Sequence, residues 1–313
     1  MKNSRIILCH PFIKKQSNPN FYKFMKISIC TEDAKRMINK IIGGINLETY
    51  IKGNKEAWEE AFDKRDPSWG ANIVEKVKNE DYAFFNQQTM ETLKKYDLAG
   101  KTIGQFCCNN GRELLSLVKT TKAKAGVGFD IAENMIDFAN EKAKELELPC
   151  EFVAKNILEI DGSYENQFDV VLITIGALCW FKNLKDYFAI VSKCLKKDGI
   201  IIINEQHPFT NMLAQKSEKE YVKEYPLNCV FSYFSHEWIS NDGMGYITGK
   251  NYESKTFTDY THSMSEIVGS MCANHIVITN MQEFDYDISE GFEYLDHKGF
   301  PLSWILEGRK ITD

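Results

Sequence analysis

Short apolar runs alternate with amphipathic stretches over residues 101–206, and again from about residue 263. Residues 170–173 and 200–203 are continuously apolar and mostly β-branched, which is typical of strands covered on both faces of a sheet. Apolar residues at helical spacing lie between the runs, and this alternation predicts βαβ units on a parallel sheet. We expect strands at about 101–107, 125–130, 150–154, 168–175, 199–206, 275–286 and 303–310, and helices at about 111–119, 133–147, 184–196 and 263–273.

The segments outside this alternation have other patterns. Residues 55–98 are mostly helical in pattern and rich in aromatic side chains, and a further short helix is expected over residues 31–42. Residues 207–260 lack strand–helix alternation, and a segment of that length in a compact domain predicts a functional insertion or lid. We therefore expect a basic N-terminal extension at 1–50. Residues 51–313 are expected to form one domain, with a helical cap at 55–98 and a lid at 207–260.

Composition is that of a globular protein. The chain has 313 residues, 43% of them hydrophobic and 26% charged, and a net charge of −6, so it can bury a sizeable core. No apolar run is long enough to span a bilayer, and the start of the chain does not resemble a signal peptide. None of the nine cysteines forms a Cys-x-x-Cys pair, so we expect no metal site and reduced thiols in the cytoplasm.

Basic charge is concentrated at the N-terminus. Residues 1–30 carry six basic residues and no acidic one, whereas the chain as a whole is acidic. A basic arm of this kind suits a nucleic-acid contact, but the net acidity makes a nucleic-acid partner unlikely, and a poorly packed tail is the simpler interpretation. No membrane partner is expected. An aromatic-rich lid is also compatible with a homodimer.

One turn carries the clearest chemical signal. The sequence Ile103-Gly-Gln-Phe-Cys-Cys-Asn-Asn-Gly111 follows the first predicted strand and leads into a helix, and Asp130 ends the second predicted strand. A turn of small residues lets a cofactor approach the backbone at a helix N-terminus. An acid at the tip of the second strand accepts hydrogen bonds from ribose hydroxyls. The sequence therefore predicts a cofactor that contains a nucleoside, but the spacing alone fits a dinucleotide as well as S-adenosylmethionine.

Two details favour S-adenosylmethionine. Dinucleotide sites usually have three glycines in this turn, whereas only Gly111 stands at an expected position here. After the third predicted strand, Asn156 is followed by the apolar pair Ile157-Leu158, and this arrangement can hydrogen-bond and enclose an adenine ring.

These residues resemble the class I S-adenosylmethionine-dependent methyltransferase superfamily. Residues 173–180, 195–199 and 205–208 are similar to one subgroup that acts on small molecules, and the similarity covers about residues 55–311. The resemblance implies a three-layer α/β/α sandwich around a Rossmann-like, seven-stranded, mainly parallel sheet whose last strand is antiparallel. It also implies methyl transfer to a small-molecule acceptor, with S-adenosylhomocysteine as the product.

The correspondence with the superfamily is incomplete in the turn. Gln105 stands where the superfamily usually has an acid, and Cys107 and Asn109 stand where it usually has glycines. Asp130 matches the ribose-binding acid, and Asn156 replaces the acid that holds the adenine amino group. By this resemblance the expected cofactor-binding residues are Gln105, Cys107, Asn109, Asn110, Gly111, Asp130, Ile131, Met135, Asn156, Ile157, Thr174, Ile175 and Gly176.

The acceptor side is less defined. Glu205 and His207 follow the fifth predicted strand and are candidates for acceptor contact or proton removal, which is needed only if the acceptor loses a proton as it attacks. The alternative is that Glu205 caps a turn and His207 only precedes Pro208. Trp180 and His262 are candidates for substrate contact, with packing and helix entry as their respective alternatives.

Three other functions stay open at this stage. A protein that binds S-adenosylmethionine without catalysis is compatible with the lost glycines, and a nicotinamide-dependent oxidoreductase uses a similar acid on the second strand. A nucleic-acid methyltransferase that uses the basic arm is the third. The Asn-Pro-Pro-aromatic sequence of enzymes that methylate base amino groups is absent after the fourth predicted strand.

Overall fold

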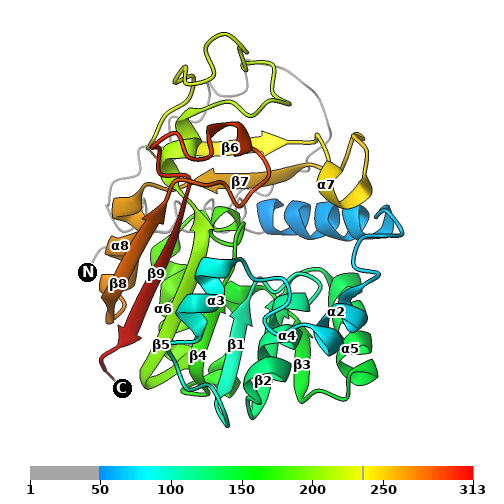
Figure 1. The fold of residues 1–313 in the computed structure, drawn as a ribbon, viewed down its shortest axis with the longest axis vertical. Coiled ribbons are helices and arrows are strands. Elements are labelled where there is room, and N and C mark those ends of the chain that lie inside the picture. Colours follow the sequence, from blue (N-terminus) through cyan, green and yellow to red (C-terminus); the bar gives the residue numbers. More distant parts are fainter. Residues whose placement is uncertain (1–48, 235, 313) are drawn as a thin grey trace, which may run out of the picture. The chain divides into compact units, whose positions relative to one another are not determined.

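A seven-stranded sheet forms the centre of the structure, a computed structural model that describes residues 49–234 and 236–312 (Figure 1). Its strands are β1 (Thr102–Phe106), β2 (Ala125–Asp130), β3 (Cys150–Ala154), β4 (Phe168–Ile173), β5 (Leu195–Gln206), β8 (Ile276–Phe284) and β9 (Ser303–Lys310). They lie in the order β3-β2-β1-β4-β5-β9-β8. Strands β1 to β5 pair in parallel, and β9 pairs antiparallel with both β5 and β8. The predicted sheet is therefore confirmed.

Helices cover both faces of this sheet and complete the predicted three-layer sandwich. Helices α6 (Leu184–Cys194) and α8 (Met264–Cys272) pack on one face. On the other face lie α2 (Ile73–Asn79), α3 (Gln87–Leu93), α4 (Arg112–Thr121) and α5 (Glu133–Glu145). Four of these, α4, α5, α6 and α8, are the helices expected from the apolar spacing.

The continuous apolar runs pack as central strands. Ile201 and Ile203 of β5 join the core on the α6 side, whereas Ile200 and Ile202 join the core on the α4 side. All four side chains are buried, because alternate residues of a strand point to opposite faces. The start of β5 differs from the prediction: the strand begins at Leu195, directly after α6, and its pairing with β4 shifts register before Ile200.

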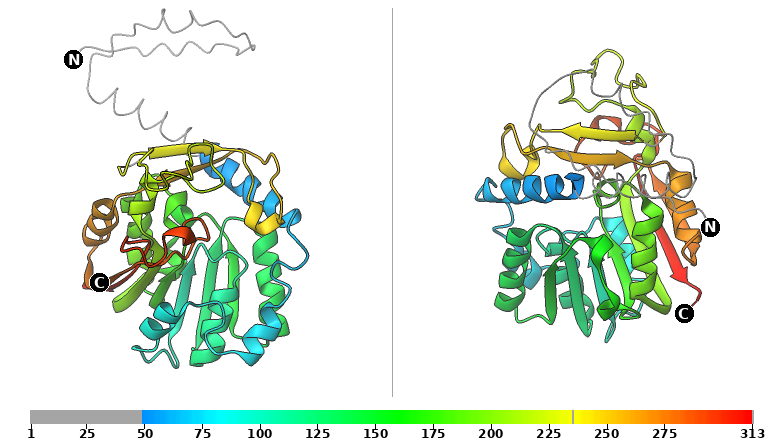
Figure 2. Two further views of the ribbon diagram at one scale, coloured as in Figure 1. Left: turned by 45° about the horizontal axis from the view of Figure 1, so that its top comes forward. Right: turned by 180° about the vertical axis from the view of Figure 1, so that it is seen from behind.

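A further layer lies across the carboxyl ends of the central strands. It contains a helix over residues 49–63 and a two-stranded antiparallel sheet of β6 (His236–Ser240) and β7 (Phe257–Thr261), with α7 (Gly245–Thr248) between them. Figure 2 shows the helix in blue and the small sheet in yellow and orange at this same end of the central sheet. The segment expected to be an insertion or lid, residues 207–260, thus contains β6 and most of β7, a strand pair that its sequence pattern did not predict.

The chain divides into two units between Leu47 and Glu48, and the expected domain boundary at residue 50 stays a prediction. The basic arm and the helix expected over 31–42 lie outside the described residues. The 49–63 helix begins before the expected cap at 55–98 and extends it. Within the described part of the chain, no helix has both the length and the apolar character that crossing a membrane requires.

Candidate cofactor and acceptor site

A cavity of about 560 Å³ opens at the carboxyl ends of β1 to β5. The central strands and the loops after them contribute Cys107, Asn109, Asp130, Ile131, Lys155, Asn156, Ile157, Leu158, Thr174, Ile175, Gly176, Cys179, Trp180, Phe181 and Gln206. The first turn of α4 adds Arg112 and Glu113. The remaining lining residues come from the covering segments and are Tyr50, Ile51, Asn54, Trp58, Trp69, Tyr246, Ile288, Ser289 and Glu290. Ten of the residues expected at the cofactor or substrate therefore line one cavity.

The turn after β1 keeps a left-handed backbone where glycines are usual. Cys107 has a φ of 60° and Asn109 a φ of 51°, and Gly111 follows with a φ of 77°. Asparagine tolerates this conformation better than cysteine does, and its side-chain oxygen accepts a hydrogen bond from the backbone N–H of Asn110 at 2.7 Å. Gly111 cannot be replaced easily, since a Cβ there would lie 2.6 Å from the ring of Phe152.

Asp130 is fixed by backbone amides at the end of β2. Its Oδ2 accepts a hydrogen bond from Asn109 N at 2.9 Å, and its Oδ1 accepts one from Ala132 N at 3.2 Å. Burial raises the pKa of this carboxyl, and the amide hydrogen bonds oppose that rise. Each carboxylate oxygen can accept a second hydrogen bond, so Asp130 still has acceptor capacity for a ligand in the cavity.

Asn156 follows β3, lines the cavity and caps the short helix η2 (Ile157–Glu159). Its Oδ1 accepts a hydrogen bond from Leu158 N at 3.1 Å, and its Nδ2 donates to Glu159 at 3.2 Å. One lone pair of Oδ1 stays available. Ile131, Ile157 and Leu158 supply apolar walls beside it.

Glu205 shapes the loop after β4 and does not line the cavity. Its side chain is buried, and its two carboxylate oxygens accept hydrogen bonds from Gly176 N at 2.7 Å and Ala177 N at 3.1 Å. Burial raises the pKa of Glu205 to about 7, against the lowering effect of these amides. This position agrees with the turn-capping alternative, and a role for Glu205 in catalysis stays a prediction.

Neither candidate histidine lines the cavity. His207 lies 2.8 Å from Glu283 through Nε2 and accepts a hydrogen bond from Phe209 N at Nδ1. His262 lies 2.9 Å from the carbonyl oxygen of Phe181. Burial lowers the pKa of both imidazoles. Their expected roles in proton removal and substrate contact are likewise untested.

Four expected cofactor residues lie behind the cavity wall. Gln105 is fully buried, and its Nε2 donates to Thr174 Oγ1 at 3.2 Å. Within the described residues, its Oε1 and the Nδ2 of Asn110 have no hydrogen-bond partner. Met135 is buried in the cluster under the 49–63 helix. Gly111 contributes close packing behind the turn.

Several lining residues were missed from the sequence. Tyr50, Asn54 and Trp58 recur every four residues and so share one face of the 49–63 helix, a spacing that offered a signal. Tyr246 on α7 and Glu290 on the loop between β8 and β9 had no such signal. They are brought to the cavity by chain segments distant from the cofactor turn.

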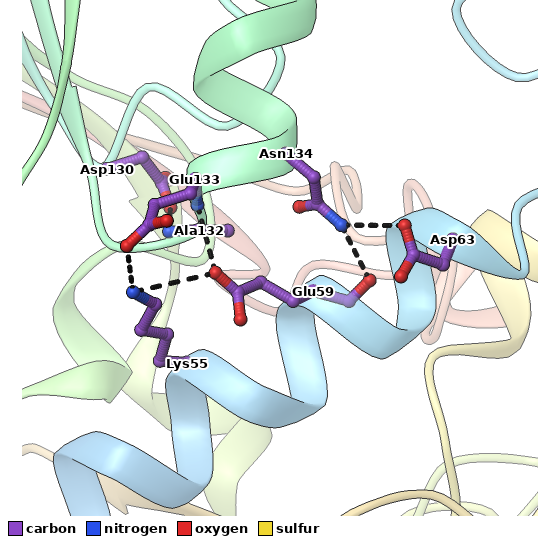
Figure 3. A network of polar contacts seen from close by, with 7 residues as sticks. All are labelled: Lys55, Glu59, Asp63, Asp130, Ala132, Glu133 and Asn134. Atoms are coloured by element: carbon purple, nitrogen blue, oxygen red, sulfur yellow. Dashed lines mark hydrogen bonds and ion pairs between the residues drawn. The ribbon is translucent and has the colours of Figure 1, made fainter.

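Polar contacts join the 49–63 helix to the start of α5 (Figure 3). Glu59 accepts a hydrogen bond from Glu133 N at 3.2 Å, and Lys55 pairs with the Glu133 carboxylate. Asn134 donates to the Glu59 carbonyl at 2.9 Å and to Asp63 at 2.9 Å. The N-cap residue of α5 offers no side-chain cap, so Glu59 supplies one from another helix. The covering helix is thereby attached beside Asp130.

A comparison with known families identifies the chain. The model of a family described as a methyltransferase domain matches residues 100–257. The chain belongs to this methyltransferase family. Among relatives of the methyltransferase, a demethylmenaquinone methyltransferase of Lactococcus lactis is 26% identical over 216 residues, which cover 66% of this chain and 82% of the relative. A second one, from Oceanobacillus iheyensis, is 31% identical over 121 residues, which cover 37% of this chain and 49% of the relative.

The fold of the methyltransferase recurs in solved structures. An S-adenosylmethionine-dependent methyltransferase from Clostridium acetobutylicum superposes with a TM-score of 0.52 at 14% identity, covering 77% of this chain and 97% of that one. The predicted class I superfamily is confirmed, and with it the cofactor, S-adenosylmethionine, and its product, S-adenosylhomocysteine.

The residues present fit this cofactor. The left-handed turn leaves room along its backbone, Asp130 keeps free acceptor capacity, and the cavity is of the size that small-molecule sites have. In the described part of the chain, no group of three or more His, Cys, Asp or Glu side chains is arranged to hold a metal ion.

Proposed function

We propose that the methyltransferase transfers the methyl group of S-adenosylmethionine to a small, largely planar acceptor. One observation carries this proposal: the cofactor-side residues and six aromatic side chains line the same cavity of about 560 Å³. That volume suits a cofactor together with a small acceptor. The names of the two relatives refer to demethylmenaquinone, and its flat quinone ring agrees with a planar acceptor group.

The aromatic residues define the acceptor end. Tyr50, Trp58, Trp69, Trp180, Phe181 and Tyr246 line the cavity. Trp180 lies between two covering segments, since its ring centroid is 5.4 Å from that of Trp58 and 6.1 Å from that of Phe257. Aromatic walls favour flat, apolar ligands. We assign Trp180 to the acceptor wall.

In this proposal the residues of the protein bind and orient the reactants. The cofactor supplies an activated methyl group, and the protein aligns the acceptor with it and excludes water. We assign Asp130 to the ribose, Asn156 to the adenine, and Thr174, Ile175 and Gly176 to the region of the methionine group. Glu205 acts as a positioning residue, because it holds the backbone amides of Gly176 and Ala177.

Binding and transfer can be measured separately. Calorimetry with S-adenosylmethionine and S-adenosylhomocysteine is expected to show one site for each. Label from the methyl group of S-adenosylmethionine is expected to appear in one member of a panel of small aromatic acceptors that includes reduced demethylmenaquinone. Folded protein that binds neither cofactor would contradict the proposal.

A second candidate is a protein that binds the cofactor without catalysis. Cys107 and Asn109 favour it, because both keep a left-handed backbone that glycine adopts without strain. Cofactor binding without transfer to any acceptor of a broad panel would support this alternative. The family match removes the case for a nicotinamide-dependent oxidoreductase.

A further inference from the structure

The loop between β8 and β9 holds one carboxylate at the cavity in an unusual conformation. Glu290 lines the cavity and has a φ of 64°, in the left-handed region that favours glycine. In the described part of the chain this side chain forms no hydrogen bond or ion pair. A strained residue of this kind persists only where its surroundings fix it, and such residues cluster at functional sites.

The surroundings of Glu290 are fixed by Asp287. The Oδ1 of Asp287 accepts hydrogen bonds from the backbone N–H of Ser289 at 2.9 Å and from its hydroxyl at 2.7 Å. The Oδ2 of Asp287 accepts one from Phe292 N at 2.7 Å. Phe292 is buried in a separate apolar cluster. The loop is therefore tied on both sides of Glu290, an exposed residue that lines the cavity.

Arg112 is the charged neighbour of Glu290. It is the first residue of α4, directly after the cofactor turn, and its Nε donates to Glu113 at 2.8 Å. Glu113 mainly, then Tyr246 and Glu290, raise the pKa of the guanidinium, while burial opposes them. Arg112 and Glu290 are close enough to interact but are not joined by an ion pair. Both terminal nitrogens of the guanidinium keep donor capacity.

The other charged residues that line the cavity have hydrogen-bond or ion-pair partners within the protein. Lys155 pairs with Asp161 at 2.9 Å and lies next to Asn156, at the adenine end. Asp130 is bound to two backbone amides, and Glu113 is bound to Arg112. Gln105 is neutral and does not line the cavity. Among the charged lining residues that the structure describes, Glu290 is thus left without a hydrogen bond or ion pair, and Arg112, although paired with Glu113 through Nε, keeps its two terminal nitrogens free for a ligand.

We propose that Arg112 and Glu290 hold the amino-acid end of the cofactor, with Arg112 at its carboxylate and Glu290 at its ammonium group. This inference rests on the proposed function, because it requires the cofactor to bind in this cavity. Glu290 supplies a negative charge at the cavity, which the neutral, buried Gln105 does not. The complementary pair matches a zwitterion, in which one charge of each sign must be compensated.

The test compares two ligands by calorimetry. S-adenosylhomocysteine has the amino-acid end, whereas 5′-methylthioadenosine has the same adenosine and sulfur without it. Glu290→Gln is expected to weaken S-adenosylhomocysteine about tenfold, equivalent to about 1.4 kcal/mol, and to leave 5′-methylthioadenosine unchanged. The matched control is Glu293→Gln, in the same loop but exposed and outside the cavity lining, which is expected to change neither.

A second variant separates binding from folding. Glu290→Gly removes the side chain where glycine suits the backbone, so Tm is expected to stay equal or rise while the selective loss of S-adenosylhomocysteine affinity persists. Arg112→Gln, made together with Glu113→Gln so that no carboxylate is left unpaired, is expected to show the same selectivity.

Two results would overturn the inference. The first is that either set of variants leaves the affinity ratio of the two ligands unchanged, which would place Arg112 and Glu290 at the acceptor or outside the site. The second is that the unmodified protein binds 5′-methylthioadenosine as tightly as S-adenosylhomocysteine. If the unmodified protein binds neither ligand, the proposed function itself fails, so the two failures are distinguishable.

Discussion

Two residues of the cofactor turn show that its backbone conformation does not require glycine. Cys107 and Asn109 adopt the left-handed conformations that glycine adopts without cost. The turn is held by other contacts, above all the hydrogen bond from Asn109 N to Asp130. Cysteine and asparagine in place of glycine therefore add backbone strain to the turn but leave its conformation the same.

Asp130 is expected to dominate cofactor affinity. Asp130→Ala removes the carboxylate assigned to the ribose, and a charged hydrogen-bond pair of this kind contributes about 1.5–3 kcal/mol. Calorimetry is expected to show a loss of S-adenosylhomocysteine affinity greater than tenfold. Asp137→Ala, at an exposed position on α5, serves as the control and is expected to bind normally. Unchanged affinity in Asp130→Ala would place the ribose elsewhere.

Glu205 is expected to make stability depend on pH. Its pKa is raised from 4.5 to about 7 by burial, so the folded state favours the protonated form. The free energy of unfolding therefore falls by up to about 3 kcal/mol as pH rises from about 4.5 to about 7. Above that range this contribution no longer changes with pH.

Glu205→Gln removes the titrating group and is expected to flatten this dependence. The measurement is chemical unfolding of both proteins at a series of pH values between 4 and 8. Equal slopes in the two proteins would show that Glu205 is not the group responsible.

At the scale of elements, the 49–63 helix is the main addition to the central sandwich. It supplies Tyr50, Asn54 and Trp58 to the cavity, and it is attached to α5 through Glu59 (Figure 3). The helix therefore acts both as a wall of the site and as a cap for a neighbouring helix.

Glu59→Ala is expected to lower the free energy of unfolding by about 1 kcal/mol, the usual effect of losing a helix N-cap. Hydrogen exchange in residues 49–63 is expected to become faster. Glu56→Ala is the matched control, because Glu56 lies on the same helix but is exposed and, among the residues that the structure describes, pairs only with the exposed Lys52. Its effect is expected to stay below about 0.5 kcal/mol. Equal effects of the two variants would contradict the capping role.

At the scale of the whole molecule, the cavity joins segments that are far apart in the chain. The 49–63 helix, α7 and residues 288–290 all line it together with the loops of the central sheet. A ligand that binds only the folded state stabilises it by about 2.7 kcal/mol at one hundred times Kd. That stabilisation is expected to reach every segment that the ligand holds together.

S-adenosylhomocysteine is accordingly expected to slow hydrogen exchange in the 49–63 helix and in residues 288–290, as well as in the loops after β1, β2 and β4. Exchange in β8, which does not line the cavity, provides the internal reference. Protection confined to the loops of the central sheet would show that the covering segments do not close over the cofactor.

The sequence alone determined the central sandwich and the cofactor end of the site. Residues 170–173 and 200–203 are apolar throughout, so the local sequence alone predicts that they are buried in a sheet covered on both faces. Three features of the site lie at the ends of successive strands: the turn that ends at Gly111, then Asp130, then Asn156. The carboxyl ends of neighbouring parallel strands meet at one edge of the sheet, so these features come together.

Tertiary structure decided the rest, because it depends on contacts between distant segments. The polar and aromatic residues of β6 and β7 carry no clear alternation in the sequence, and their pairing places Phe257 against Trp180, a contact between distant segments. Glu290 reaches the cavity only because Asp287 and the buried Phe292 fix its loop. The acidic side chain of Glu205 indicated chemistry in the sequence, yet in the fold its hydrogen bonds go to the backbone of the loop after β4.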